Sequence, residues 1–285
     1  MDTVELDAET TAEAGSEANA CIQSGSYLLE LSLDWIVLRA SENIHHLLRE
    51  SHVTLIDEPL GKFVHSQALH DLRNLFSRLS GTTGIGRAYA VRLTDDHDLV
   101  DIAFQLADGR VLLEAVPSSG CFGECFGSVG GLIAGLANSH GTALLDGGAR
   151  RMRALTGYDR VTLVCGDRRA ESSRGAFAAP SDAGDLPILL ADSKVEGVPV
   201  FPREPEETSL DAALMRAPDK KGRDALEAQG IRSMLRIAFH ADGLSCEFCC
   251  ESRTPREPSF ELHAAAELFA QMFAMRLAID EATKR

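Results

Sequence analysis

The first part of the chain alternates short β-type runs with short amphipathic helices. Residues 26–40 contain two strand-like runs, which we expect to form a hairpin. Apolar residues in 66–81 recur at spacings of three and four, which predicts a helix; they are Leu69, Leu72, Leu75, Phe76 and Leu79. Three further β-type runs follow, and Asp108-Gly109 between the last two is typical of a tight hairpin turn. This order of elements predicts an α/β domain over residues 21–117.

The second part repeats the mixture of helices and strands after a stretch rich in glycine, serine and cysteine. We interpret residues 118–131 as a linker. A helix with a break at one of its glycines is expected between residues 132 and 155, and strand patterns recur at 231–240 and 244–250. The fold class is therefore α/β (α+β), with a second domain over 132–285. Each domain is expected to have a central antiparallel sheet flanked by helices.

Two segments of the second part have patterns of particular interest. Residues 197–230 begin as a Pro-punctuated loop and continue as an acidic helix with Arg216 near its end. A second short helix then ends at Gly230. The last helix begins near Ser259 and carries one apolar stripe, formed by Phe260, Leu268, Phe269, Met272, Phe273 and Leu277. This stripe packs against its own domain or against a partner, and the sequence leaves both interpretations open.

Composition narrows the classes of function. Of 285 residues, 45% are hydrophobic and 25% charged, as in ordinary globular domains, and the net charge of −15 argues against nucleic-acid and anionic-membrane binding. No apolar run is long enough to span a bilayer. Residues 1–20 are acidic and small, so we expect a disordered tail rather than a signal peptide, and a cytoplasmic protein.

The seven cysteines are an odd, scattered set, which indicates reduced thiols. Cys121 and Cys125, and Cys246 and Cys249, have spacings found in metal sites, but no histidine completes either pair, and the second pair lies on an expected strand. We therefore expect no metal site. Cys121 and Cys125 are the better candidates for oxidation. No Ser-His-Asp or Cys-His arrangement has a supporting motif, so no enzyme is expected.

Several motifs, in order along the chain, resemble the chromophore-binding module of bacterial phytochromes. TGYDRVTLVCGD at 156–167 resembles the family's Thr-Gly-Tyr-Asp-Arg-Val-Met-Val-Tyr, with six consecutive identities. Ile22, Gln23 and Gly25 match part of the Ile-Gln-Pro-His-Gly motif of the family's PAS domain. The resemblance covers about residues 22–283 and implies a PAS domain followed by a GAF domain. No segment resembles the family's downstream PHY, histidine kinase or GGDEF-type domains.

The resemblance also implies where a linear tetrapyrrole would be held. Cys21 lies near the family's attachment cysteine, and Ser181 and Asp182 belong to a motif whose aspartate organises the pyrrole nitrogens. Arg216 matches the arginine that binds a propionate, and Glu251 falls where a histidine contacts the last ring.

Other positions depart from the family pattern. Gly222 replaces a histidine beside the chromophore, and Met234 and Arg236 replace two serines that bind a propionate. A helix of the pocket wall is missing after Asp182. A carboxylate at Glu251 is a poor exchange for an imidazole, because carboxylate and bilin carbonyl are both hydrogen-bond acceptors.

These departures predict a module without a cofactor. We expect a non-catalytic sensory or adaptor protein that contacts a kinase or response regulator, or a second copy of itself through its last helix. One alternative is a red/far-red photoreceptor that binds biliverdin in a reshaped pocket. Another is a GAF sensor of a different small ligand or of redox state.

Overall fold

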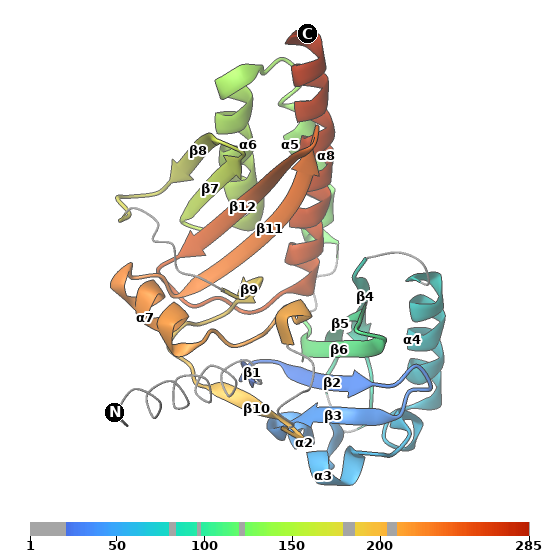
Figure 1. Cartoon of the computed structure of the whole chain (residues 1–285). Helices are drawn as coiled ribbons and strands as arrows, with labels where there is room; N and C mark the ends of the chain where they lie inside the picture. The colour runs from blue at the N-terminus through green and yellow to red at the C-terminus, as the bar shows by residue number, and fades with distance from the viewer. Residues whose placement is uncertain are drawn as a thin grey trace, which may run out of the picture. The chain divides into compact units, whose positions relative to one another are not determined.

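The computed structural model describes residues 21–79, 84–95, 98–119, 123–178, 186–203 and 210–284 (Figure 1). The chain divides into two compact units that are interleaved along the sequence. Unit 1 combines residues 1–120 with 184–187 and 194–224, and unit 2 combines 121–183, 188–193 and 225–285. Each unit contains one antiparallel sheet with helices, so the predicted α/β class is confirmed. The segment 194–224, predicted within the second domain, is grouped with the first unit.

Unit 1 is built on a seven-stranded sheet in the order β1-β10-β3-β2-β6-β5-β4. The strands are β1 (Cys21–Gln23), β2 (Tyr27–Leu31), β3 (Val37–Ser41), β4 (Gly86–Val91), β5 (Val100–Ala107), β6 (Arg110–Pro117) and β10 (Gly197–Phe201). The predicted hairpin in 26–40 is confirmed by the pairing of β2 with β3. Asp108 and Gly109 have φ values of 49° and 77°, as a tight turn between β5 and β6 requires.

The two faces of this sheet carry separate apolar cores. The helical elements are η1 (Glu42–Ile44), α2 (His45–Leu48), α3 (His52–Leu55), η2 (Leu60–Lys62), α4 (Ser66–Leu79) and η3 (Leu210–Ala212). Helix α4 packs its predicted stripe against the larger core, where Leu69 and Leu72 are buried. The smaller core joins Leu28 of β2 and Leu112 of β6 to Leu210 of the segment 194–224.

Unit 2 is built on a five-stranded sheet in the order β8-β7-β12-β11-β9. The strands are β7 (Arg160–Cys165), β8 (Arg168–Ser173), β9 (Leu189–Leu190), β11 (Ser233–Ala241) and β12 (Leu244–Ser252). The helices are α5 (Glu124–Ala134), α6 (Gly141–Thr156) and α8 (Phe260–Lys284), and α7 (Lys220–Ala228) contains the boundary between the units. The strands at 231–240 and 244–250 and the helix break before Gly141 are confirmed.

One face of this sheet packs against α8. Phe239 and Phe248 of the sheet contact Phe273, and Phe248 also contacts Phe269. Phe260, Phe269, Phe273 and Leu277 are almost fully buried, so most of the predicted stripe on the last helix packs against its own unit.

Three expectations from the sequence differ from the structure. Helix α5 begins within the predicted linker and extends three residues beyond it, and Glu261 of α8 accepts hydrogen bonds from backbone N–H groups at its start. Arg216 lies outside any helix and instead forms a bridge to Ile22, because β1 is available as a partner. Cys165 and Cys246 form a disulfide rather than thiols, because they are register partners on β7 and β12.

Within the described ranges, no helix has both the length and the apolar content that crossing a bilayer would require.

Candidate functional site

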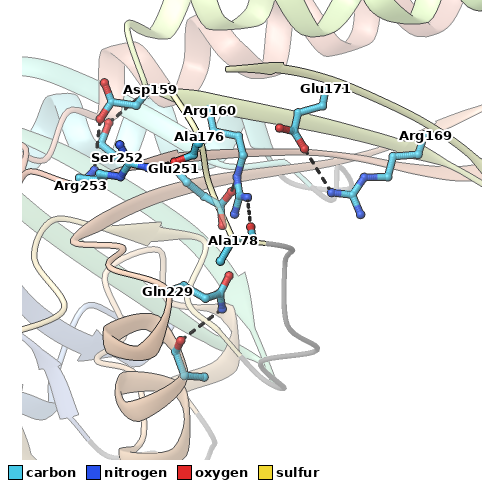
Figure 2. A network of polar contacts seen from close by, with 11 residues as sticks. Asp159, Arg160, Arg169, Glu171, Ala176, Ala178, Gln229, Glu251, Ser252 and Arg253 are labelled. Atoms are coloured by element: carbon cyan, nitrogen blue, oxygen red, sulfur yellow. Dashed lines mark hydrogen bonds and ion pairs between the residues drawn. The ribbon is translucent and has the colours of Figure 1, made fainter. Parts of the chain in front are cut away.

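An ion pair between Arg160 and Glu251 joins β7 to β12 in unit 2 (Figure 2). By the strand register, it lies on the face of the sheet opposite to Phe248. The two residues are register partners, Arg160 at the start of β7 and Glu251 near the end of β12. The Nε of Arg160 donates to Oε2 of Glu251 at 2.5 Å, and their side chains are only 1% and 5% exposed. Burial strengthens the attraction between the charges but removes their hydration, so each charge depends on the other.

The Arg160 guanidinium has further contacts that fix its orientation. Its Nη1 donates to the carbonyl oxygen of Ala178 at 2.6 Å. Two guanidinium groups lie over the ring of Phe177, with its centroid 4.7 Å from Cζ of Arg160 and 4.1 Å from Cζ of Arg253. Arg253 also donates to the carbonyl of Ala176 (Figure 2). Residues 176–178 are therefore held against the sheet by both arginines through cation–π and hydrogen-bond contacts.

The neighbouring positions on the same face are also polar. Cys249 lies between Thr162 and Arg236 in the strand register. Burial raises the pKa of the Cys249 thiol well above its usual value, and the charge of Glu251 raises it further. The thiol is thus neutral at physiological pH and unsuited to nucleophilic chemistry. Arg236 donates from Nε to Oε1 of Glu247 at 2.9 Å, which forms a second ion pair on this face.

Two predicted ligand residues, Cys21 and Arg216, lie close together in unit 1. Ile22, next to Cys21, forms a bridge to Arg216, and the carbonyl oxygen of Cys21 accepts a hydrogen bond from the backbone N–H of Ala217 at 2.9 Å. Arg216 is 3% exposed, and its Nε lies 3.9 Å from Oδ1 of Asp211. Cys21 is partly buried and carries no disulfide.

Of the other predicted ligand residues, one belongs to unit 2 and two lie outside the described residues. Glu251 belongs to unit 2, whereas Cys21 and Arg216 belong to unit 1. Ser181 and Asp182 lie outside the described residues. Arg160 is a site residue that the sequence did not predict, although the motif at 156–167 places it correctly at the start of a strand. Only the antiparallel register of β7 and β12 brings Arg160 to Glu251, and pairing over that sequence distance leaves no local signal.

A small cavity lies in the larger core of unit 1. Its volume is about 10 Å³, and its walls are apolar side chains such as Leu29, Ile44 and Leu113. That volume is about what one water molecule needs, and the walls offer water few polar partners. This cavity is therefore a packing defect rather than a ligand site.

The two units together have the fold of a phytochrome chromophore-binding module. The chain is similar to the crystal structure of the chromophore-binding domain of an unusual bacteriophytochrome from R. palustris, with a TM-score of 0.75 and 21% identity over 94% of this chain and 98% of that one. The chromophore-binding domain of Stigmatella aurantiaca phytochrome P1 gives a TM-score of 0.75 and 21% identity, over 92% of this chain and 97% of that one. The sequence matches no protein-family model and no curated protein.

Proposed function

We propose that this chain is a non-catalytic, phytochrome-like PAS–GAF sensory or adaptor module that acts through protein–protein contacts and holds no bilin. The observation that carries the proposal is the buried pair of Arg160 and Glu251. Glu251 stands where the resemblance puts a histidine against the chromophore, and it already has its partner within the protein. The two charges of this pair are therefore balanced within the chain, whereas Nη2 of Arg160 and Oγ1 of Thr162 on the same face are buried without a hydrogen-bond partner among the described residues.

The donors present fit a bilin poorly. The ligand carries two propionates, which need fixed cations, and ring carbonyls, which need hydrogen-bond donors. Arg160 and Arg236 each have a carboxylate partner, Glu251 and Glu247, at 2.5–2.9 Å. A bilin carbonyl placed beside Glu251 would meet an acceptor, and a propionate would meet a like charge. Arg216 matches an arginine of the family that binds a propionate, but one buried arginine cannot neutralise two propionates.

The outer side of α8 is the proposed contact surface. Leu268, Met275 and Ile279 are 39%, 68% and 61% exposed. They are seven and four residues apart, which places them on one side of the helix, away from the buried Phe269 and Phe273. An apolar helix side that faces water suits packing against another helix. The partner would be a second copy of this chain or a signalling protein such as a kinase or response regulator.

Pigment binding can be tested directly by co-expressing the protein with a heme oxygenase. We expect no red absorption band, and no zinc-induced fluorescence at the protein's position on a denaturing gel. A photoconvertible, covalently tagged product would contradict the proposal and support the biliverdin alternative. The variant Cys21→Ala would then show whether Cys21 is the attachment site. If the tag is lost in this variant, the pigment is attached to Cys21.

The contact surface can be tested with a charge-bearing variant. If the partner is a second copy, the double variant Met275→Glu/Ile279→Glu should self-associate more weakly in sedimentation experiments. If the partner is a kinase or response regulator, the double variant should no longer capture the proteins that the wild-type protein captures. Val53→Glu is a matched control, because Val53 is 72% exposed on α3 of unit 1. The proposal of a contact surface on α8 would be refuted by two results together. The wild-type protein would be a monomer, and its captured partners would bind both variants equally well.

A further inference from the structure

Strand β8 forms one edge of the unit 2 sheet, and its outer side has no strand partner among the described residues (Figure 1). All six of its residues pair with β7 in one continuous register, without a bulge. On such an edge strand, every second residue presents its N–H and C=O groups away from the sheet. A regular, open edge is a template on which another strand can pair.

One backbone hydrogen bond shows which residues of β8 point outward. The N–H of Arg174 donates to the carbonyl oxygen of Asp159 at 2.7 Å, so the backbone groups of Arg174 face the β7 side. Because the direction alternates along an antiparallel strand, the even-numbered residues of β8 bond to β7. The odd-numbered residues Arg169, Glu171 and Ser173 therefore present their backbone groups outward. Within the described part of the chain, no hydrogen bond reaches these groups.

The other three sheet edges are poor templates. Strand β1 has three residues and β9 has two. Strand β4 has six residues, but its register with β5 shifts between Ala88 and Val91. Within this bulge, Ala90 has a φ of 52° and donates its N–H to Asp101. Short or bulged edges resist pairing with a further strand, so β8 is the edge that is suited to it.

We propose that β8 pairs antiparallel with β8 of a second copy of this chain, so that two unit 2 sheets join into one sheet about a two-fold axis at Ala170. Outward residues must face outward residues, which allows an axis at a residue but not between two residues. With the axis at Ala170, Arg169 of each copy lies opposite Glu171 of the other, and opposite charges attract across the strands. An axis at Arg169 or at Glu171 would place two like charges opposite each other.

Both faces of β8 suit this pairing. Arg169 and Glu171 form an ion pair of 3.4 Å along the strand, with side chains 47% and 38% exposed, so each can exchange its partner for one on the second copy (Figure 2). On the other face Ala170, which is 5% exposed, would lie at the axis. The axis falls on a non-hydrogen-bonded pair, where the two Cα atoms are about 4.5 Å apart, and the small side chain of alanine permits this approach.

This contact is separate from the surface on α8 and does not depend on whether a bilin binds. A strand of six residues buries less than the roughly 1,200 Å² of a stable complex, so the dimer is transient. Backbone hydrogen bonds supply the attraction, and the two symmetric charge pairs set the register.

The wild-type chain provides the first test. Sedimentation of the full chain at concentrations up to about 1 mM should show a concentration-dependent dimer. The amides of Arg169 and Glu171 should become protected from hydrogen exchange as the dimer forms, because they gain carbonyl partners. A wild-type protein that is monomeric at every concentration, or a dimer in which these two amides stay unprotected, would overturn the proposal.

Charge reversal tests the register. Arg169→Glu and Glu171→Arg should each weaken the dimer by about tenfold or more, because two attractive pairs become two repulsive ones. Both side chains are partly exposed, so circular dichroism should show an unchanged fold. An equimolar mixture of the two variants should dimerise again, because each pair then joins opposite charges. If the wild-type protein dimerises but the mixture does not, the proposed register is wrong.

The α8 variant Met275→Glu/Ile279→Glu distinguishes this contact from the surface on α8. It should leave the protection of the Arg169 and Glu171 amides unchanged. If self-association is lost in the α8 variant and survives both charge reversals, the copies meet through α8 and the β8 proposal is overturned. If the charge reversals remove self-association and the α8 variant retains it, the contact is the one on β8.

Discussion

Removal of the Glu251 carboxylate tests the importance of the buried ion pair. In Glu251→Ala, the guanidinium of Arg160 keeps its bond to the Ala178 carbonyl and its contact with Phe177, but it loses the carboxylate of Glu251. Its side chain is 1% exposed, so water cannot replace the lost oxygen without a rearrangement. The variant therefore leaves a buried positive charge without compensation.

The expected loss is large for a single side chain. Breaking a buried pair by removing one partner typically costs about 3–5 kcal/mol, because the remaining charge stays desolvated. A whole domain is stable by only about 5–15 kcal/mol, so much of the stability of unit 2 would be lost. At about 2–4 °C per kcal/mol for a domain of this size, the melting temperature should fall by roughly 10 °C.

The assay must resolve the two units, because a chain of two units need not unfold in one step. Hydrogen exchange followed by mass spectrometry does so through peptides from β7 and β12 of unit 2. Those peptides should exchange roughly 100-fold faster or more in Glu251→Ala, as expected from a loss of about 3 kcal/mol. Trp35, the one tryptophan of the chain, lies in unit 1, so its fluorescence follows that unit separately.

Two further variants separate the charge from the shape of the side chain. Glu251→Gln keeps an acceptor oxygen and should lose less stability than Glu251→Ala. The double variant Arg160→Met/Glu251→Leu removes both charges and should recover most of the loss, since apolar replacements of buried pairs are often neutral or stabilising. A loss below about 1 kcal/mol in Glu251→Ala, or no recovery in the double variant, would refute the reasoning.

Two shorter predictions concern the core of unit 2. Gly148→Ala should destabilise the unit by about 1–3 kcal/mol in thermal unfolding, because a Cβ atom there would lie 2.5 Å from the ring of Phe273. Gly130→Ala is the control: a Cβ atom there would have no neighbour within 4 Å, so the variant should be neutral or stabilising. Thiol titration of the denatured, unreduced protein should find two fewer thiols than its seven cysteines, and detection of all seven would contradict the Cys165–Cys246 bond.

Local signals predicted the elements that depend on local chemistry. The turn at Asp108-Gly109 requires positive φ values, which these residues tolerate, and the hairpin forms there. The motif at 156–167 also places its elements correctly: α6 ends at Thr156, Gly157 adopts a φ of 68°, and β7 begins at Arg160. Such features need only a few consecutive residues.

Features that depend on distant partners escaped prediction. Glycines 127, 130 and 131 argue against a helix, yet α5 forms because Glu261 of α8 caps its first turn. Arg216 leaves its predicted helix because strand β1 offers backbone partners. Among the predicted ligand residues that the structure describes, Cys21 and Arg216 are neighbours in unit 1. The sequence contained no indication that Glu251 would meet Arg160.

The pairing of β7 with β12 is fixed at both ends and on both faces. Arg160 and Glu251 meet at one end on the polar face, and Cys165 and Cys246 are joined at the other end on the face toward α8. A slip of one residue would move every side chain of β7 to the opposite face and break both contacts. A strand pair constrained in this way keeps its register without a bound ligand. The register of these two strands is therefore fixed by contacts within the chain, which supports the proposal of a module that holds no bilin.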